Sequence, residues 1–96
     1  MDSIIWSQAA LDDLDEIYRY IARDSPLNAQ MMIDGIIKKT DYLLDFPDLG
    51  KTYPELDDPN VRIILFRNFH IIYQLIDNNI EIVRVVHGRR AFKLDL

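Results

Sequence analysis

The sequence predicts an α+β fold made of an N-terminal strand, an antiparallel helical hairpin and a three-stranded antiparallel meander. Apolar residues recur at helical spacing through the first half of the chain, and after Asn60 the spacing changes to alternation. Turn-forming residues then separate short apolar runs. A chain of 96 residues can bury one modest core, so we expect a single domain over residues 1–96.

The first expected elements are a short strand at residues 4–6 and a helix over about residues 8–23. Ser7 lies between them and suits a helix N-cap. Asp12 and Asp13 fall in the first turns, where negative charge favours the helix dipole. We expect the opening strand to join the sheet, but periodicity does not give its position. The apolar face of the helix consists of Leu11, Leu14, Ile17, Tyr18 and Ile21.

A second helix follows a break at residues 24–26 (Asp-Ser-Pro). Ser25 can cap it, and Pro26 fits the first helical position, where a missing N–H costs nothing. The apolar stripe continues to Leu44, and Pro47 disfavours helix at the residue before it, so we expect the helix to end near Phe46. The short break requires the two helices to run antiparallel.

The second half of the chain predicts a loop and three strands. Prolines, a glycine and acidic residues over 47–60 indicate the loop. Strands are expected at 61–66, 69–76 and 80–87, with turns between them, and two successive hairpins make a meander. In the middle strand Phe69, Ile71, Tyr73 and Leu75 share one face, so Tyr73 is expected in the core.

Composition excludes several classes of site. Apolar residues make up 49% of the chain and charged residues 28%, which is typical of a globular protein. There is no cysteine, so neither a disulfide nor a cysteine-based zinc site is possible. His70 and His87 are the two histidines and lack metal-ligand spacing. We expect no metal or cofactor, no membrane segment and a cytoplasmic location.

The net charge of -5 is unevenly distributed. Residues 1–60 carry 5 Lys or Arg against 13 Asp or Glu, whereas residues 61–96 carry 6 against 3. This asymmetry suits a protein with one basic functional surface. It also suits acidic residues that only solvate exposed helix faces.

Basic residues at the end of the last strand are the main candidates for chemistry. Gly88 allows a sharp turn after His87, and the guanidiniums of Arg89 and Arg90 follow it. Arginine offers a planar fork suited to phosphate or carboxylate. The alternative is a solvated basic tail. His87 could act as an acid or base near neutral pH, or it could be a structural residue at a strand end.

Three further basic residues could join that surface. Arg62 and Arg84 fall on adjacent or next-nearest strands, and Lys51 could reach them from the loop. We expect the arginines to gather at one end of the sheet. The alternative for both arginines is pairing with Glu81 or an acidic loop residue. Among the tyrosines, Tyr18 and Tyr42 are expected to close the helix–sheet interface, and Tyr20 to lie on the outer helix surface.

Several segments resemble one family when taken together. Residues 4–14 (IIWSQAALDDL) resemble the N-terminal signature of ParE-type toxins. Residues 43–51 (LLDFPDLGK) resemble the leucine–proline–glycine–basic segment of that family, and residues 80–90 (IEIVRVVHGRR) its last strand and terminal His-Gly-Arg-Arg. The chain is thus similar to the ParE branch of the ParE/RelE toxin superfamily. It departs from the family pattern with Lys51 in place of arginine, and in its overall acidity.

The resemblance implies a RelE/ParE-like fold and a toxin of a type II toxin–antitoxin module, of the kind that acts in plasmid stabilization. It implies a hetero-oligomer with a ParD-like antitoxin. An amphipathic antitoxin tail across the helical hairpin and sheet is expected, with Tyr20 and Arg67 as candidate contacts. The candidate residues for target binding or toxicity are Lys51, Arg62, Arg84, His87, Arg89 and Arg90.

The resemblance also implies two activities. ParE-type toxins poison DNA gyrase, and RelE-type toxins cleave mRNA on the ribosome. Cleavage needs an acid, a base and affinity for a polyanion. His87 is the candidate acid or base, but residues 91–96 lack the tyrosine that RelE-type enzymes often carry there, and the acidic first sixty residues would repel RNA. We therefore expect gyrase poisoning without intrinsic catalysis. A RelE-like endoribonuclease and an inactive interaction module are the alternatives.

Overall fold

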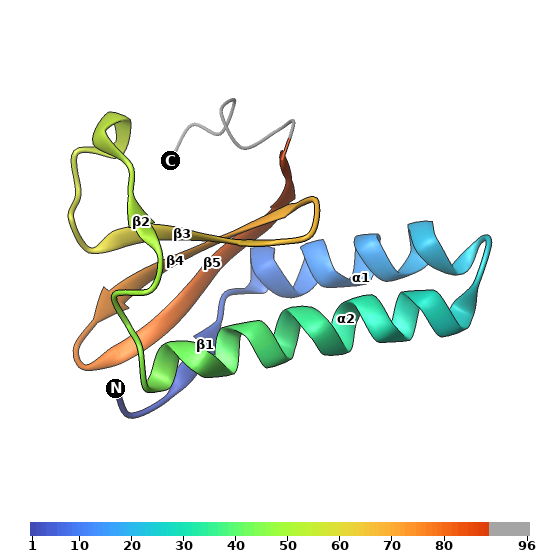
Figure 1. Ribbon diagram of the computed structural model, residues 1–96, viewed down its shortest axis with the longest axis horizontal. Coiled ribbons are helices and arrows are strands. Elements are labelled where there is room, and N and C mark those ends of the chain that lie inside the picture. The colour runs from blue at the N-terminus through green and yellow to red at the C-terminus, as the bar shows by residue number, and fades with distance from the viewer. Residues whose placement is uncertain (89–96) are drawn as a thin grey trace.

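The computed structural model describes residues 1–88, in which two helices pack against one face of a five-stranded sheet (Figure 1). The helices are joined by a tight connection and lie side by side. The α+β prediction is therefore confirmed. The elements in chain order are β1 (Ile4–Trp6), α1 (Gln8–Ala22), α2 (Pro26–Asp41), η1 (Tyr42–Leu44), β2 (Lys51–Thr52), η2 (Pro54–Leu56), β3 (Val61–Phe66), β4 (Phe69–Ile76) and β5 (Asn79–His87).

The strand order across the sheet is β1-β5-β4-β3-β2. The three strands of the predicted meander pair antiparallel at its centre. β1 joins as an edge strand parallel to β5, with Ile4 opposite Ile80. β2 forms the other edge, with Thr52 opposite Arg62. β2 was predicted as loop, because two residues are too few to show a period.

Serine side chains cap both helices as predicted. The Ser7 hydroxyl accepts a hydrogen bond from the Ala10 N–H at 3.0 Å and donates one to the carbonyl of Val83 at 2.8 Å. The Ser25 hydroxyl accepts from the Asn28 N–H at 3.1 Å. The Ser7 cap thus also ties the start of α1 to β5.

The second helix ends earlier than predicted. α2 stops at Asp41, and tighter turns carry the chain to Phe46. The Phe46 N–H still bonds to the carbonyl of Tyr42 at 2.9 Å. Helical hydrogen bonding therefore reaches the residue before Pro47, where proline restricts the backbone, but regular α-geometry is lost sooner.

The core lies between the helices and the sheet. The predicted face of β4 turns toward it, and Tyr73 is fully buried. Gly35 of α2 lies so close to the ring of Phe66 that a Cβ there would be 2.4 Å from the ring carbon Cζ. A smaller cluster around buried Ile72 and Val86 is separate from this core. The residues buried in the main core are Ala10, Ile36, Leu43, Ile64, Ile71, Tyr73, Ile80, Ile82 and Val85.

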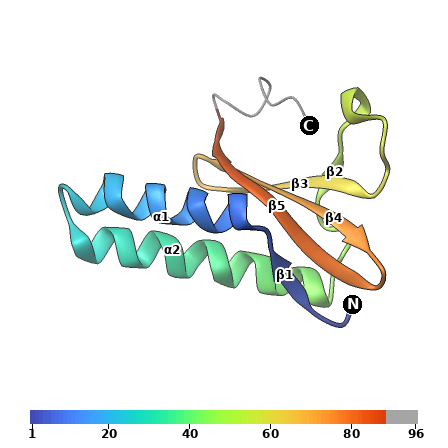
Figure 2. The same cartoon turned by 180° about the vertical axis from the view of Figure 1, so that it is seen from behind.

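The tip of the helical hairpin extends beyond the sheet (Figures 1 and 2). Sheet therefore covers only part of the apolar stripes. Near the tip Tyr20, Leu27 and Met31 are more than half exposed, and the exposure of Tyr20 was predicted. Tyr42 is 50% exposed, so the prediction that it closes the helix–sheet interface was wrong, whereas Tyr18 is half-buried. Leu11, on the predicted apolar face of the first helix, is 45% exposed. Helical spacing identifies a face but not how much of it the sheet reaches.

Candidate functional site

A groove of about 1050 Å³ runs between the helical hairpin and the end of the sheet where β3 turns into β4 and β5 ends. α1 and α2 supply one wall, and the Arg67–Phe69 turn with the last residues of β5 supplies the other. Its floor is apolar. The apolar side chains are Ile17, Ile21, Met31, Met32, Phe69, Val85 and Val86, and the charged ones are Asp13, Glu16, Arg19, Arg23, Arg67 and Arg84.

An ion pair in the groove joins α1 to β5. Asp13 accepts hydrogen bonds from Nε and Nη2 of Arg84 at 2.8 and 2.9 Å. The same carboxylate accepts the backbone N–H of Val85 at 2.9 Å. This pairing raises the pKa of Arg84 above its usual value. The Asp13 side chain is 11% exposed, so the pair is well shielded on its acidic side.

The outer end of β5 is held against the β3–β4 turn. The His87 ring meets the Phe69 ring edge-on, with centroids 5.8 Å apart. The Gly88 N–H donates to the carbonyl of Asn68 at 2.7 Å. Arg67 has a positive φ of 53° and its guanidinium lies over the Phe66 ring at 5.6 Å. These contacts fix the wall of the groove that carries His87 and Arg67.

The opposite wall carries an exposed tyrosine beside an arginine. Tyr20 is 70% exposed, and the guanidinium of Arg23 lies 5.8 Å from its ring centroid. Arg19 pairs with Asp15 at 2.9 Å on the exposed surface. Because Asp13 neutralises Arg84, the remaining charges on the groove walls are mainly positive, although the whole chain carries a net charge of -5.

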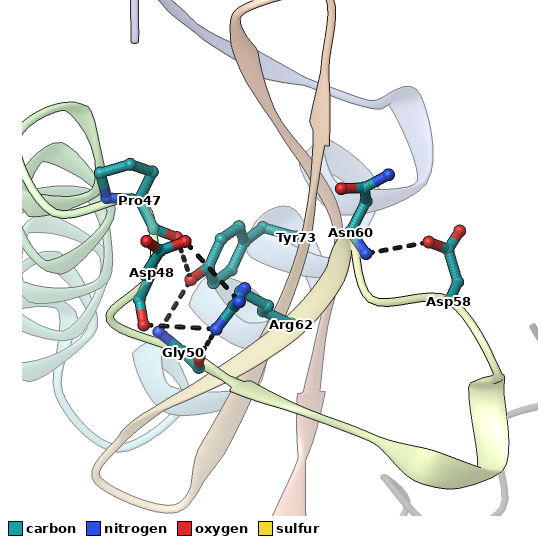
Figure 3. Close-up of polar contacts among 7 residues, drawn as sticks. All are labelled: Pro47, Asp48, Gly50, Asp58, Asn60, Arg62 and Tyr73. Carbon is teal, nitrogen blue, oxygen red and sulfur yellow. Dashed lines mark hydrogen bonds and ion pairs between the residues drawn. The ribbon is translucent and has the colours of Figure 1, made fainter.

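A second polar network fixes the loop that follows the helices (Figure 3). The buried Tyr73 hydroxyl donates to the carbonyl of Pro47 at 2.7 Å and accepts the Gly50 N–H at 2.8 Å. Arg62 donates to the Gly50 carbonyl at 2.8 Å and pairs with the Asp48 carboxylate at 3.6 Å. We call these contacts the loop latch. Burial raises the pKa of Tyr73, although the hydrogen bond from Gly50 and the charge of Arg62 act in the opposite direction.

The predicted target-binding residues fall in two places. Lys51 and Arg62 lie at the β2 edge of the sheet, beside the loop latch. Arg84 and His87 line the groove, together with the candidate antitoxin contacts Tyr20 and Arg67. Arg62 and Arg84 occupy neighbouring register rows of β3 and β5, but bind different partners. Arg89 and Arg90, which were also predicted to bind the target, lie outside the described residues.

Arg62 of β3 and Arg84 of β5 each form an ion pair. Arg62 pairs with acidic Asp48 of the loop, which is one of the two readings that the sequence allowed. Arg84 pairs with Asp13, whereas Glu81 accepts a hydrogen bond from Gln74 at 2.7 Å. From its position in the sequence, Asp13 was predicted only to interact favourably with the helix dipole. No local signal could have found its role, because its partner lies 71 residues away.

Residues 1–88 hold no cluster of three or more His, Asp or Glu side chains placed to bind a metal ion. Over the same range no helix is long and apolar enough to cross a membrane.

A helical hairpin on one face of a five-stranded mixed sheet, with an open amphipathic groove between them, defines a small α+β protein suited to binding a peptide segment. Residues 4–92 match the family model described as the ParE toxin of the type II toxin-antitoxin system parDE, and the chain belongs to that family. It is therefore a toxin of the ParE/RelE superfamily.

Two relatives support this assignment over nearly the whole chain. Toxin RelE2 of Caulobacter vibrioides is 32% identical over 91 residues, which cover 94% of this chain and 99% of the relative. A solved structure described as the chromosomal ParDE TA system from P. aeruginosa is 27% identical with a TM-score of 0.73. That match covers 88% of this chain and 94% of the solved one.

Proposed function

We propose that this toxin poisons DNA gyrase through protein contacts, without catalysis of its own, and that a ParD-like antitoxin neutralises it. The observation that carries the proposal is the pairing of Arg84 with Asp13. Arg84 lies in the groove beside His87, where a nuclease would need a cation for the phosphate. Two of its nitrogens are instead bonded to Asp13, which cancels its charge within the groove.

The groove itself suits the antitoxin. Its apolar floor and exposed Tyr20 match the apolar face of an amphipathic helix, and the cations of Arg23 and Arg67 border that floor. Opposite charge across an interface steers association and fixes register. The proposed occupant is therefore an antitoxin segment with acidic residues flanking an apolar stripe. Toxin and antitoxin would form a hetero-oligomer in the cytoplasm.

Purified toxin tested on two targets discriminates the proposed function from its alternatives. A gyrase poison should inhibit supercoiling of plasmid DNA by gyrase and accumulate cleaved DNA, and the cognate antitoxin should reverse both effects. In cells, induction without antitoxin should cause filaments and DNA breaks. Cleavage of mRNA on purified ribosomes with no effect on gyrase would establish the nuclease instead, with His87 as its candidate acid or base. A chain that leaves both targets and growth unaffected would be an inactive interaction module.

A further inference from the structure

Three large apolar side chains are exposed on one short segment at the C-terminal end of the helical hairpin. Tyr42 is 50% exposed, Phe46 60% and Leu49 49%. Consecutive turns link them, because the Phe46 N–H bonds to the Tyr42 carbonyl and the Leu49 N–H to the Phe46 carbonyl. We call this segment, residues 42–49, the apolar patch. Clustered exposed apolar side chains mark interaction sites more often than isolated ones do.

The loop latch holds the C-terminal end of the patch in place. Tyr73 bonds to backbone atoms on both sides of Leu49, at Pro47 and at Gly50. Arg62 bonds to the carbonyl of Gly50 as well. The backbone on both sides of Leu49 is therefore held in place by a buried side chain, and Figure 3 shows the contacts of Tyr73 with Pro47 and Gly50. A preordered segment binds a partner without the entropy loss of ordering a loop.

The charges around the patch indicate the chemistry of its partner. Residues 41–49 contain Asp41, Asp45 and Asp48 and no Lys or Arg. Arg62 pairs with Asp48, whereas Asp41 and Asp45 are exposed, and these two carboxylates disfavour contact with phosphate. The patch complements a protein surface with an apolar pocket bordered by lysine or arginine. Buried aromatic anchors supply much of the binding energy in such interfaces.

The patch is separate from the groove. The groove uses the N-terminal half of α2, at Met31 and Met32, whereas the patch begins where α2 ends (Figures 1 and 2). Fifteen residues from Met31 to Phe46 at helical rise correspond to roughly 20 Å. Within residues 1–88, no residue after Met32 and before Arg67 lines the groove. A partner in the groove therefore leaves the patch available to a second one.

We propose that the apolar patch is the surface through which this toxin contacts its target protein, with Phe46 and Leu49 as anchors that enter an apolar pocket with a basic border. The proposal rests on the proposed function, and it assigns a role to a segment distinct from the antitoxin groove. Lys51 follows the patch in the sequence, two residues after Leu49.

The test compares two double variants, each of which removes two exposed apolar side chains. Phe46→Ser with Leu49→Ser removes both anchors, and Leu27→Ser with Leu65→Ser is the matched control, because Leu27 is 69% and Leu65 60% exposed elsewhere on the chain. Each protein is measured for binding to purified DNA gyrase, growth arrest on induction, antitoxin affinity and thermal unfolding. The anchor variant should bind gyrase at least about tenfold more weakly and lose growth arrest. Its antitoxin affinity and unfolding temperature should match those of the control.

Two further variants test the latch and the charge. Tyr73→Phe keeps the anchors but removes the hydroxyl that holds Pro47 and Gly50, and it should weaken gyrase binding several-fold while the chain remains folded. Asp45→Lys should slow association with a basic-bordered pocket. Faster association of Asp45→Lys would indicate a polyanionic partner and overturn the proposal.

The outcomes separate failure of this inference from failure of the proposed function. If the wild-type chain poisons gyrase and the anchor variant does so equally well, the patch is not the target surface. If the wild-type chain leaves gyrase unaffected, the gyrase assignment fails. In that case the patch is supported only if the anchor variant loses growth arrest while the control variant keeps it. The inference is overturned if the anchor variant and the control variant both arrest growth. It is also overturned if the wild-type chain acts by cleaving mRNA.

Discussion

Asp13 of α1 accepts both Nε and Nη2 of Arg84 from β5, and its carboxylate also takes the N–H of Val85. The position of this contact on β5 explains why a side chain, and not a neighbouring strand, accepts the N–H of Val85. β1 pairs with β5 only up to Ile82, so within residues 1–88 the edge of β5 opposite β4 has no strand beside it beyond that residue. Asp13 satisfies the backbone donor that a longer β1 would have paired, and it does so from the helix that covers the sheet. The ion pair is therefore part of the fold as well as of the groove.

Replacement of Asp13 by alanine should lower the free energy of unfolding by about 2–3 kcal/mol, because it leaves the N–H of Val85 and a partly buried guanidinium without their acceptor. Urea denaturation measures the change. Asp15→Ala is the matched control, since Asp15 lies on the same helix in an exposed i,i+4 pair with Arg19 and should change stability by less than about 0.5 kcal/mol. Equal losses in the two variants would contradict a structural role for Asp13.

Gly35→Ala should destabilise the protein despite a better helix propensity. The added Cβ would lie 2.4 Å from Cζ of Phe66, whose ring packs against the core. Overpacking of this kind costs about 1–3 kcal/mol, against a propensity gain of about 1 kcal/mol. Adding Phe66→Leu should recover part of the loss. Additive losses in the double variant would show that the ring does not limit the size of residue 35.

Tyr73→Phe should lower the free energy of unfolding by about 1–3 kcal/mol at neutral pH, because the Gly50 N–H and the Pro47 carbonyl lose their shared partner. Tyr42→Phe is the control. Its ring is half exposed, so loss of that hydroxyl should have little effect. Denaturant titrations of both variants at pH 7 measure the difference. A smaller loss for Tyr73→Phe than for Tyr42→Phe would argue against the loop latch.

The stability provided by Tyr73 should also depend on alkaline pH. Its pKa in the folded protein lies above the ordinary value of 10.0. Above about pH 10 the unfolded chain releases the phenol proton before the folded protein does, so ionisation favours unfolding. The advantage of the wild-type chain over Tyr73→Phe should therefore be complete below pH 10 and shrink as pH rises through the folded pKa. A difference that stays constant from pH 8 to 11 would contradict this.

Charge reversal in the groove should weaken antitoxin binding. Arg23→Glu and Arg67→Glu place negative charge beside the apolar floor, where an acidic antitoxin segment is proposed to lie. Each change should reduce affinity by about tenfold, more at low salt than at high salt. Lys39→Glu, outside the groove, controls for the change in net charge. Tighter binding of the Arg67→Glu protein would indicate a basic antitoxin segment.

The sequence predicted the presence of the longer helices and strands better than the residues at which they end. The meander, both helix caps and the core position of Tyr73 follow from local period and capping residues, and all are confirmed. β2 has two residues and no period, so it was missed. The predicted end of α2, near Phe46, lies beyond the observed end at Asp41. Pro47 sets the last residue that a helix can include, but it does not show whether regular α-helical geometry is lost before that residue.

The sequence by itself determined both helices and every strand except β2, because burying one face imposes a period that can be recognised locally along the chain. Its family resemblance was also sufficient to identify a toxin of the ParE/RelE superfamily. Only the tertiary structure decided what the charged side chains do. Arg84 found its acceptor 71 residues away on α1, and Arg62 bonded to a loop that Tyr73 holds. An ion pair depends on distance in space, and separation along the chain gives no measure of it.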